Sequence, residues 1–386
     1  ERRNVDPSDA YEECLYAALT VFLQLLCDTA AAEPPANQEP APLVHLRQPR
    51  LFLEHTYLEN LRDSDIRRRF RLGREAILHL YHLIEEKIVP TTQRSHAVPG
   101  MVKLLTTLYI LGRESFQTTS GIVVGISQPT VSRVFMQVID AILDLVPQFI
   151  YWPQNEDEWN AVKVAFYQQA QMLQILGAID CTHVAIRAPR REELDFCNRK
   201  QYHSLNVQVV CDARQRIMIV NSDFPGSCHY AFILQQSGVY RKFQSGQMPD
   251  SWLLGDAAYL QLMWLMAPVR YPQSLAETNY NKAHCKSRAI VEQTVGLLKA
   301  RFLCLARPGG ELLYSPKKCS RIILACCLLH NICQARNDSW EMTEEREPEV
   351  RQLRVSRRRS TVDGMATRAD LIARYFTCTY SVVGRD

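Results

Sequence analysis

The chain contains 13 cysteines, yet it has no Cys-x-x-Cys pair and no cysteine at all between Cys27 and Cys181. Regularly spaced cysteines are typical of disulfide scaffolds, so their absence argues for a reducing, intracellular compartment. The apolar segment 322–333 carries cysteine and histidine side chains at helical spacing, for which zinc binding is an alternative. We favour core packing, because thiols inside an apolar helix are usually buried; the residues are Cys326, Cys327, His330 and Cys333.

No hydrophobic run reaches the roughly 20 residues that a membrane span requires. The apolar residues 11–27 have a shorter uninterrupted core, which is bracketed by Glu12, Glu13 and Asp28. We expect an amphipathic helix there that packs on the body of the protein or on a partner, and no association with a membrane. The Ala- and Pro-rich residues 30–42 that follow are typical of a linker.

Net charge is also low. Lys and Arg number 45 against 41 for Asp and Glu, which gives a formal net charge of +4. Such a balance permits nucleic-acid binding through local basic patches but does not by itself indicate it. With 386 residues, 47% of them hydrophobic, the chain is long enough for about two globular domains.

Two apolar runs each end on an aspartate. Residues 173–179 lead into Asp180, and residues 251–255 lead into Asp256. Short apolar runs of this kind predict buried strands. Because an ionised carboxylate is costly to bury alone, each aspartate predicts a nearby cation or metal ion. Taken singly, either could simply form a turn at the end of its strand.

A third carboxylate, Glu292, lies in a predicted helix over Lys286–Phe302. Apolar residues at helical spacing predict one buried stripe of this helix, made by Val291, Val295, Leu298 and Phe302. The adjacent stripe contains Arg288, Glu292, Gly296 and Lys299. Taken alone, Glu292 could be a solvated helix residue. Two aspartates at strand ends and a glutamate on a later helix form the arrangement by which a ribonuclease-H-like fold holds two divalent ions, and such oxygen ligands suit Mg²⁺ or Mn²⁺.

The order of the predicted elements favours a mixed α/β sheet. After the Asp180 strand, residues 205–213 and 216–222 predict a hairpin, residues 229–243 a helix, and residues 251–259 the Asp256 strand. Strand, strand, strand, helix, strand and helices is the order of a ribonuclease-H-like fold. Residues 364–376 predict a closing helix.

Residues 51–153 have a helical pattern, within which residues 116–140 predict a helix-turn-helix. Ser127 can cap its second helix, and Pro129 suits the first turn. In this interpretation the outward side chains lie near base edges or phosphates; in the alternative the segment is an ordinary helical hairpin. The outward residues that would contact DNA are Gln128, Thr130 and Arg133.

Basic side chains gather in two further places. The run formed by Arg67, Arg68, Arg69, Arg71 and Arg74 predicts either a solvated face or phosphate contacts. The second group follows Asp180, and its members are either polar loop residues or groups that hold the phosphate of the scissile strand. This second group consists of His183, Arg187, Arg199, Lys200 and His203.

Several longer motifs resemble those of the PIF/Harbinger transposases and transposase-derived nucleases, a DDE superfamily. The resemblance covers residues 51–376, and the motifs include GAIDCTHVAIRAP at 177–189, LLGDAAY at 253–259, NKAHCKSRAIVEQTVGLLKARF at 281–302 and ACCLLHNI at 325–332. It implies that Asp180, Asp256 and Glu292 are the catalytic, metal-binding triad, with Mg²⁺ or Mn²⁺ as the cofactor and two ions bound. With the stripe described above, Arg288 and Lys299 become further candidate DNA contacts.

The fold class that follows is α/β. We expect an N-terminal helix and linker over 1–48, a helical helix-turn-helix domain over 49–160, a ribonuclease-H-like DDE nuclease domain over 161–338, and a charged linker with a C-terminal helix over 339–386. The family usually has Asp shortly after Pro-Gly-Ser at 225–227, whereas this chain has Tyr230. The tyrosine at this position favours the alternative that the protein binds DNA or a partner without cutting.

The function implied by the resemblance is a metal-dependent endonuclease and strand transferase that cuts transposon ends and joins 3′-hydroxyl ends to target DNA. The alternative is a domesticated protein that binds DNA or a partner without cutting. The expected partners are DNA, a Myb-like DNA-binding protein and a second copy of the chain. We expect nuclear localisation, with a cytoplasmic pool when the Myb-like partner is absent, because residues 357–359 form only a short basic run.

Overall fold

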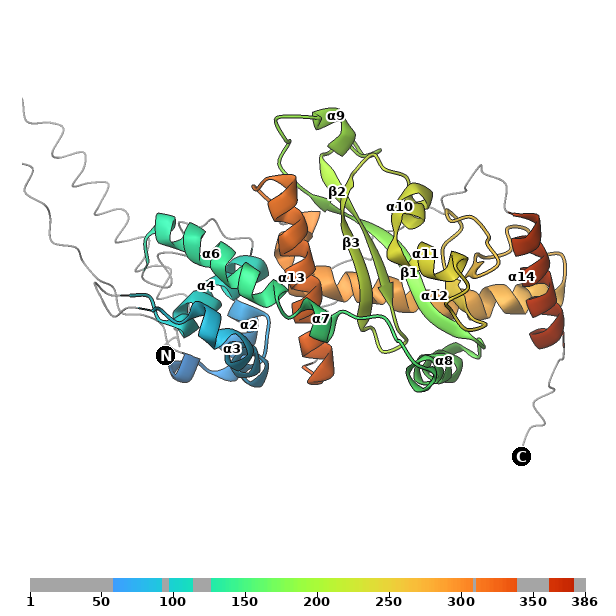
Figure 1. Ribbon diagram of the computed structural model, residues 1–386, viewed down its shortest axis with the longest axis horizontal. Helices are drawn as coiled ribbons and strands as arrows, with labels where there is room; N and C mark the ends of the chain where they lie inside the picture. Colours follow the sequence, from blue (N-terminus) through green and yellow to red (C-terminus); the bar gives the residue numbers. More distant parts are fainter. Residues whose placement is uncertain (1–57, 92–96, 114–125, 308–309, 339–360, 378–386) are drawn as a thin grey trace, which may run out of the picture. The chain divides into compact units, whose positions relative to one another are not determined.

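The computed structural model describes residues 58–91, 97–113, 126–307, 310–338 and 361–377, all of which belong to one compact unit, Phe52–Asp386 (Figure 1). Several predicted features lie outside the described residues: the apolar helix at 11–27, the linker at 30–42, the first helix of the helix-turn-helix and the basic run at 357–359. None of the described helices combines the length and the hydrophobicity needed to cross a membrane.

The N-terminal described part is helical, as the sequence predicts. Its buried faces share one core, in which Ile66, Ile77, Leu104 and Val138 are all inaccessible to solvent. Helix α6 begins at the predicted place, with Ser127 at its N-cap position and Pro129 in its first turn. The elements are η1 (Leu58–Asn60), α2 (Asp63–Phe70), α3 (Arg74–Ile88), α4 (Gly100–Arg113), α6 (Gln128–Leu143) and α7 (Val146–Phe149).

A five-stranded sheet follows, with the strand order β3-β2-β1-β4-β5. Strand β2 pairs antiparallel with β1 and β3, whereas β4 pairs parallel with β1 and with β5. This mixed sheet is the one expected for a ribonuclease-H-like domain, and the predicted hairpin of its second and third strands is confirmed. The strands are β1 (Ile175–Ala185), β2 (Ser204–Cys211), β3 (Ile217–Pro225), β4 (Trp252–Leu254) and β5 (Leu265–Met266).

Helices cover both faces and the edge of this sheet (Figure 1). Helix α8 packs on β1, so the predicted domain boundary at 160/161 falls inside a helix that belongs with the sheet. Helix α12 crosses the sheet behind the strands in the view of Figure 1. The elements are α8 (Glu156–Ala170), α9 (Glu193–Phe196), α10 (Tyr230–Gln236), α11 (Gly238–Gln244), α12 (Leu275–Arg301), η2 (Leu303–Leu305), α13 (Pro316–Ala335) and α14 (Val362–Tyr375).

Four elements differ clearly from their predicted extents. Strand β4 covers only Trp252–Leu254, whereas the sequence predicted a strand as far as residue 259. Strand β1 does not end at Asp180, because its pairing with β2 continues as far as Ala185. The predicted helix over 229–243 is two helices, since Ser237 adopts an extended conformation and caps α11 with its side chain. Helix α12 starts eleven residues before Lys286, at a capping box formed by Ser274 and Glu277. The buried stripe predicted for it is confirmed.

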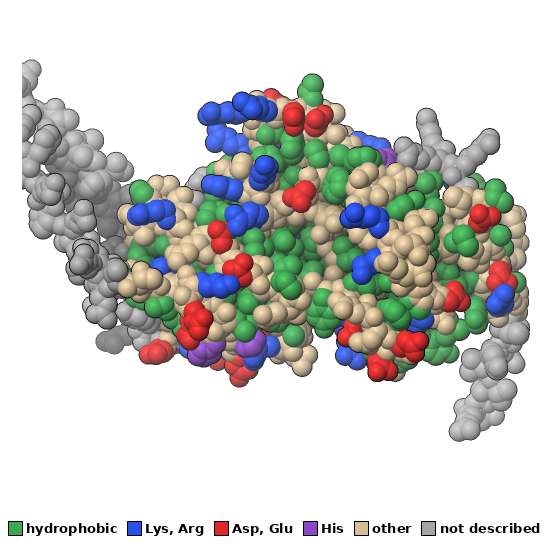
Figure 2. Space-filling view, viewed as in Figure 1, with side chains coloured by type: hydrophobic (Ala, Val, Ile, Leu, Met, Phe, Trp, Pro, Cys, Tyr) green, Lys and Arg blue, Asp and Glu red, His purple; other side chains and the backbone are tan. Residues whose placement is uncertain are grey.

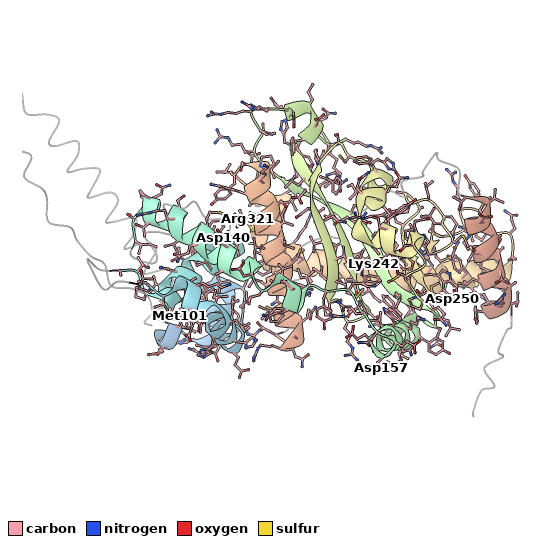
Figure 3. The ribbon with its side chains drawn as sticks, viewed as in Figure 1. Met101, Asp140, Asp157, Lys242, Asp250 and Arg321 are labelled. Atoms are coloured by element: carbon pink, nitrogen blue, oxygen red, sulfur yellow. The ribbon has the colours of Figure 1, made fainter. Side chains whose placement is uncertain are left out.

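Helix α13 joins the helical part to the sheet. The side-chain amide of Asn331 accepts a hydrogen bond from the N–H of Ile217 on β3 (2.8 Å) and donates to its carbonyl (2.7 Å). On the other side, Arg321 forms an ion pair with Asp140 of α6 (Figure 3). The helix is buried over most of its length, which confirms core packing for its apolar segment, including Cys326, Cys327, His330 and Cys333.

A buried carboxylate at the end of α13 is a second connection. Asp338 accepts a hydrogen bond from the N–H of Gly73 (2.7 Å) and forms an ion pair with Arg67. Its carbonyl accepts from the fully buried Arg301 of α12 (2.7 Å). Other members of the Arg67–Arg74 run are also engaged within the protein: Arg74 pairs with Asp63 and Arg68 with Asp65. Much of this run therefore stabilises the helical part itself.

Candidate active site

Asp180 and Asp256 lie at the same level of two adjacent parallel strands. In the β1–β4 register Ala178 faces Leu254, and each aspartate follows its member of this pair by two residues. Strand β4 ends at Leu254, so Asp256 begins the loop where the chain leaves the sheet. Asp180 is 1% exposed, whereas Asp256 is half-buried. The two carboxylates are thus gathered at one point of the sheet, open to solvent through Asp256.

Main-chain groups orient both carboxylates. Asp180 Oδ1 accepts a hydrogen bond from the N–H of Cys181 (2.8 Å), and Asp256 Oδ1 accepts from the N–H of Ala258 (2.9 Å). The second contact is a turn at the end of the strand, which is the purely structural role that the sequence allowed for Asp256. A turn and a ligand role are compatible, because a carboxylate has further lone pairs for a cation.

A buried polar group that the sequence did not single out lies next to the aspartates. The hydroxyl of Tyr259 is 3.2 Å from Cys181 Sγ and 3.5 Å from Gln208 Nε2. Burial raises the pKa of Tyr259 well above its ordinary value, and the neighbouring Cys181, Asp180 and Asp256 side chains raise it further. Both aspartates are therefore close enough to disfavour a phenolate, and Tyr259 remains a neutral hydroxyl.

Gly255 makes room for this tyrosine. A Cβ atom at Gly255 would lie 3.1 Å from the ring of Tyr259, which is tighter than ordinary van der Waals contact. The motif LLGDAAY therefore has a packing explanation. Asp256 supplies the carboxylate, and the residue before it lets the aromatic ring fold back against the strand.

Tyr230 covers the far side of Tyr259. Their ring centroids are 6.1 Å apart with an interplanar angle of 30°. Tyr230 is the first residue of α10, whose N-cap is His229, and the ring of His229 lies 6.0 Å from that of Tyr230. Position 230, at which the family resemblance predicts an acid, thus lies next to the ring of Tyr259 and is aromatic here.

Glu292 stands on α12, which packs against β1. Its carboxylate forms an ion pair with Arg288, one turn earlier, and its side chain is 39% exposed. On the same helix, Lys299 donates a hydrogen bond to the carbonyl of His183 on β1 (2.8 Å). The stripe predicted beside the buried face, Arg288, Glu292, Gly296 and Lys299, is half-buried, as expected. Its two basic residues, Arg288 and Lys299, make contacts within the protein.

Among the described residues, no three His, Cys, Asp or Glu side chains are grouped so as to hold a metal ion. The structure brings Asp180 and Asp256 together, and Glu292 is held by Arg288. The donor set still fits Mg²⁺ or Mn²⁺, which prefer carboxylate oxygens, and Glu292 is partly exposed on the helix that packs on β1. Glu292 can act as a third ligand only if its ion pair with Arg288 is released.

The predicted DNA contacts lie in separate places. Gln128 and Arg133 are exposed and Thr130 is half-buried at the start of α6. Arg187, Arg199 and Lys200 are exposed beyond the end of β1, and the ring of His203 is 3.2 Å from Glu193. Arg187 follows Asp180 by seven residues, so the extended chain places them roughly 20 Å apart.

The strand order and the paired aspartates define this chain as a DDE-type nuclease fold. A family model described as "DDE superfamily endonuclease" matches residues 179–331. The chain is 40% identical to "Putative nuclease HARBI1" from Rattus norvegicus over 280 residues, which cover 72% of this chain and 80% of that one. It is 35% identical to the protein of the same name from Xenopus laevis, covering 72% and 81%.

A plant relative is more distant: "Protein ALP1-like" from Arabidopsis thaliana is 27% identical over 238 residues, covering 58% of this chain and 57% of that one. No solved structure matches the chain. The chain belongs to the family of Harbinger-derived nucleases within the DDE endonuclease superfamily. Members of this superfamily generally use divalent metal ions, and their nuclease chemistry indicates DNA as the substrate.

Proposed function

We propose that this protein is a metal-dependent DNA endonuclease and strand transferase of a Harbinger-type transposon. It would cut at the ends of the element and join the 3′-hydroxyl ends to target DNA. The observation that carries the proposal is the placement of Asp180 and Asp256 at one level of two adjacent parallel strands. Burying a carboxylate such as that of Asp180 is costly, and a divalent ion held by the two aspartates would offset that cost.

Asp180 and Asp256 would hold the divalent ions, and Glu292 would be the third ligand once its ion pair with Arg288 is released. The released Arg288 then has a charged group available for a DNA phosphate. When bound, a pair of Mg²⁺ or Mn²⁺ ions stabilises the charge that develops on the attacking and leaving oxygens during phosphoryl transfer. Tyr259 and Cys181 are buried next to the carboxylates. Burial raises the pKa of both groups, so both keep their protons and neither acts as an acid or base in the reaction.

The test is a cleavage assay on duplexes that carry the ends of the matching transposon, with Mg²⁺, Mn²⁺ or EDTA. Asp180→Asn and Asp256→Asn should reduce cleavage to background while the protein stays folded. Asp157→Asn is the matched control, because Asp157 is an exposed aspartate in the first turn of α8. Cleavage that survives EDTA, or an Asp256→Asn protein that still cuts, would contradict the assignment.

A second candidate is a protein that binds DNA or a partner without cutting. Two observations favour it: the aromatic Tyr230 next to the ring of Tyr259, and the ion pair that engages Glu292. In that case wild type and Asp180→Asn should bind the same duplexes equally well, and neither should cut them with any divalent ion.

Helix α6 supports DNA recognition in either case, because its first two turns present Gln128 and Arg133 to solvent. We include a Myb-like protein as the partner that brings the chain to its sites and into the nucleus, and a second copy of the chain for the other transposon end.

A further inference from the structure

The positive charge of this protein is concentrated at the outer end of β1. Residues 187–200 and 307–318 together contain eight basic and four acidic residues. Their excess of four positive charges equals the formal net charge of the whole chain, +4. Basic and acidic residues are therefore equal in number in the rest of the sequence. The basic residues are Arg187, Arg190, Arg191, Arg199, Lys200, Arg307, Lys317 and Lys318; we call them the β1-end basic surface.

The fold brings these two segments together although more than 100 residues separate them. Ile186 forms a β-bridge with Leu312, and the N–H of Arg187 donates to the carbonyl of Leu312 (3.0 Å). The guanidinium of Arg307 lies 4.2 Å from the ring centroid of Tyr202. Figure 2 shows Lys and Arg side chains gathered at this end of the molecule, beside and below α9.

Most of this charge is not neutralised within the described part of the chain. Arg190, Arg191 and Arg307 form no ion pair among the described residues, and neither do Lys317 and Lys318, all of them exposed. The acidic residues nearby are Glu192, Glu193, Asp195 and Glu311, and Glu193 faces His203 (3.2 Å). Helix α13 also begins here, at Pro316, so the positive end of its dipole has the same sign.

Strand β1 fixes the distance from this surface to the candidate active site. Arg187 follows Asp180 by seven residues, which at about 3.3 Å per residue places the Arg187 end of the surface roughly 20 Å from Asp180. The side chain of Arg187 cannot span that distance, so it does not hold the phosphate at the candidate active site. In a duplex, 20 Å corresponds to roughly six base pairs.

We propose that the β1-end basic surface binds the phosphate backbone of the duplex flanking the cleavage site, about six base pairs from the scissile bond. This inference rests on the proposed function for the position of the scissile bond, but binding can be measured without cleavage. Contacts of this type are independent of base sequence and position the duplex.

The test uses the full chain in EDTA and fluorescein-labelled duplexes of arbitrary sequence, 8 and 30 base pairs long, titrated over a range of salt concentrations. The variant is Arg190→Ala/Arg191→Ala/Lys317→Ala/Lys318→Ala. Its control is Lys282→Ala/Lys286→Ala, which removes two exposed lysines from the N-terminal half of α12, outside the β1-end basic surface. We expect at least a tenfold loss of affinity for the 30-base-pair duplex in the variant and less than twofold in the control.

The salt dependence gives a second readout. Loss of four phosphate contacts should lower the slope of log K against log salt by about 3 to 4. A variant that binds the long duplex with wild-type affinity and slope overturns the inference, and so does a wild-type protein that binds no duplex. Failure of cleavage with intact, surface-dependent binding would overturn the proposed nuclease function and leave this surface standing.

On a duplex that the protein cuts, a photo-crosslinking residue at position 191 locates the contact. Crosslinks five to eight base pairs from the cleaved bond support the inference. Crosslinks confined to the nucleotides at the cleaved bond contradict it.

Discussion

The ring of Tyr230 lies 6.1 Å from the ring of Tyr259, whose hydroxyl is 3.2 Å from the thiol of Cys181, the residue next to Asp180. An aromatic side chain at position 230 is therefore in contact with the layer that supports the carboxylate pair. The difference from related sequences at this one position has a direct structural connection to the candidate active site.

Tyr230→Asp should raise metal-dependent cleavage about tenfold, equivalent to about 1.4 kcal/mol, because it introduces the acid that the family resemblance predicts at this position. Single-turnover cleavage rates with Mg²⁺ measure the effect. Tyr230→Phe is the control and should behave like wild type, since it keeps the ring. An unchanged rate in a protein that is already fully active would mean that this position is dispensable for catalysis.

Arg288→Gln should strengthen divalent-ion binding in the absence of DNA, because it frees Glu292 from its ion pair. The measurement is the Mn²⁺ concentration at half-maximal thermal stabilisation, which we expect to fall severalfold. Lys286→Gln changes a basic residue on the same helix that is exposed and should leave the midpoint unchanged. Equal midpoints for wild type and Arg288→Gln would show that the ion pair does not compete with the metal.

Helix α12 and the hairpin show what the sequence could predict. Spacing alone placed Val291, Val295 and Leu298 on the buried face, because helical periodicity is a local property. The hairpin turn is equally local: Asp212 accepts hydrogen bonds from the N–H groups of Arg214 and Arg216 (both 2.9 Å).

Contacts between distant segments were beyond such reasoning. Cys181 and Tyr259 meet although 78 residues separate them, and no periodicity connects them. Strand β5 has only two residues, too few for any pattern. The apolar runs that end on Asp180 and Asp256 singled out these residues, and the family motifs assigned both to one triad. The spatial basis of the pair, the parallel β1–β4 register, is visible only in the fold.

Asp338→Asn should lower the free energy of unfolding by about 3 kcal/mol, because the charge facing the buried Arg301 and Arg67 is lost. Urea unfolding at pH 7.5 gives the value. Asp65→Asn is the matched control: it removes a carboxylate from a pair on the surface, with Arg68, and should cost less than about 1 kcal/mol. Similar losses in both variants would contradict the structural role of Asp338.

Protonation of buried histidines should destabilise the protein in mild acid. Burial lowers the pKa of His284 and of His330 to about 4. The unfolded chain binds these protons below pH 6.5 and the native protein does not, so stability is unaffected above that pH and falls as the pH decreases towards 4. Between pH 7.5 and 5 each histidine should account for a loss of about 2 kcal/mol.

The contribution of His330 can be isolated by urea unfolding of His330→Gln at both pH values. Its loss between pH 7.5 and 5 should be about 2 kcal/mol smaller than that of wild type. In His82→Gln, which alters an exposed histidine, the loss should equal that of wild type. A His330→Gln protein with the full wild-type loss would contradict the prediction.

Nuclear accumulation should require the Myb-like partner, since the chain has a formal net charge of only +4 and the short basic run at 357–359 is a weak nuclear signal. A fluorescently tagged chain should be largely cytoplasmic when expressed alone and nuclear when expressed with the partner. Strong nuclear signal from the chain alone, together with nanomolar specific DNA binding, would rule the dependence out.

The contact between Asn331 and Ile217 has a consequence for assembly. Strand β3 is one of the two outer strands of the sheet, and outer strands ordinarily offer their N–H and C=O groups to another chain. Here the side-chain amide of Asn331 forms hydrogen bonds with both main-chain groups of Ile217, and the hydroxyl of Ser320 on the same helix is 2.8 Å from that of Ser222. Main-chain pairing with a second copy is thereby hindered at Ile217. Two copies that meet at this end of β3 would do so through side chains, so point substitutions there would separate pairing from cutting.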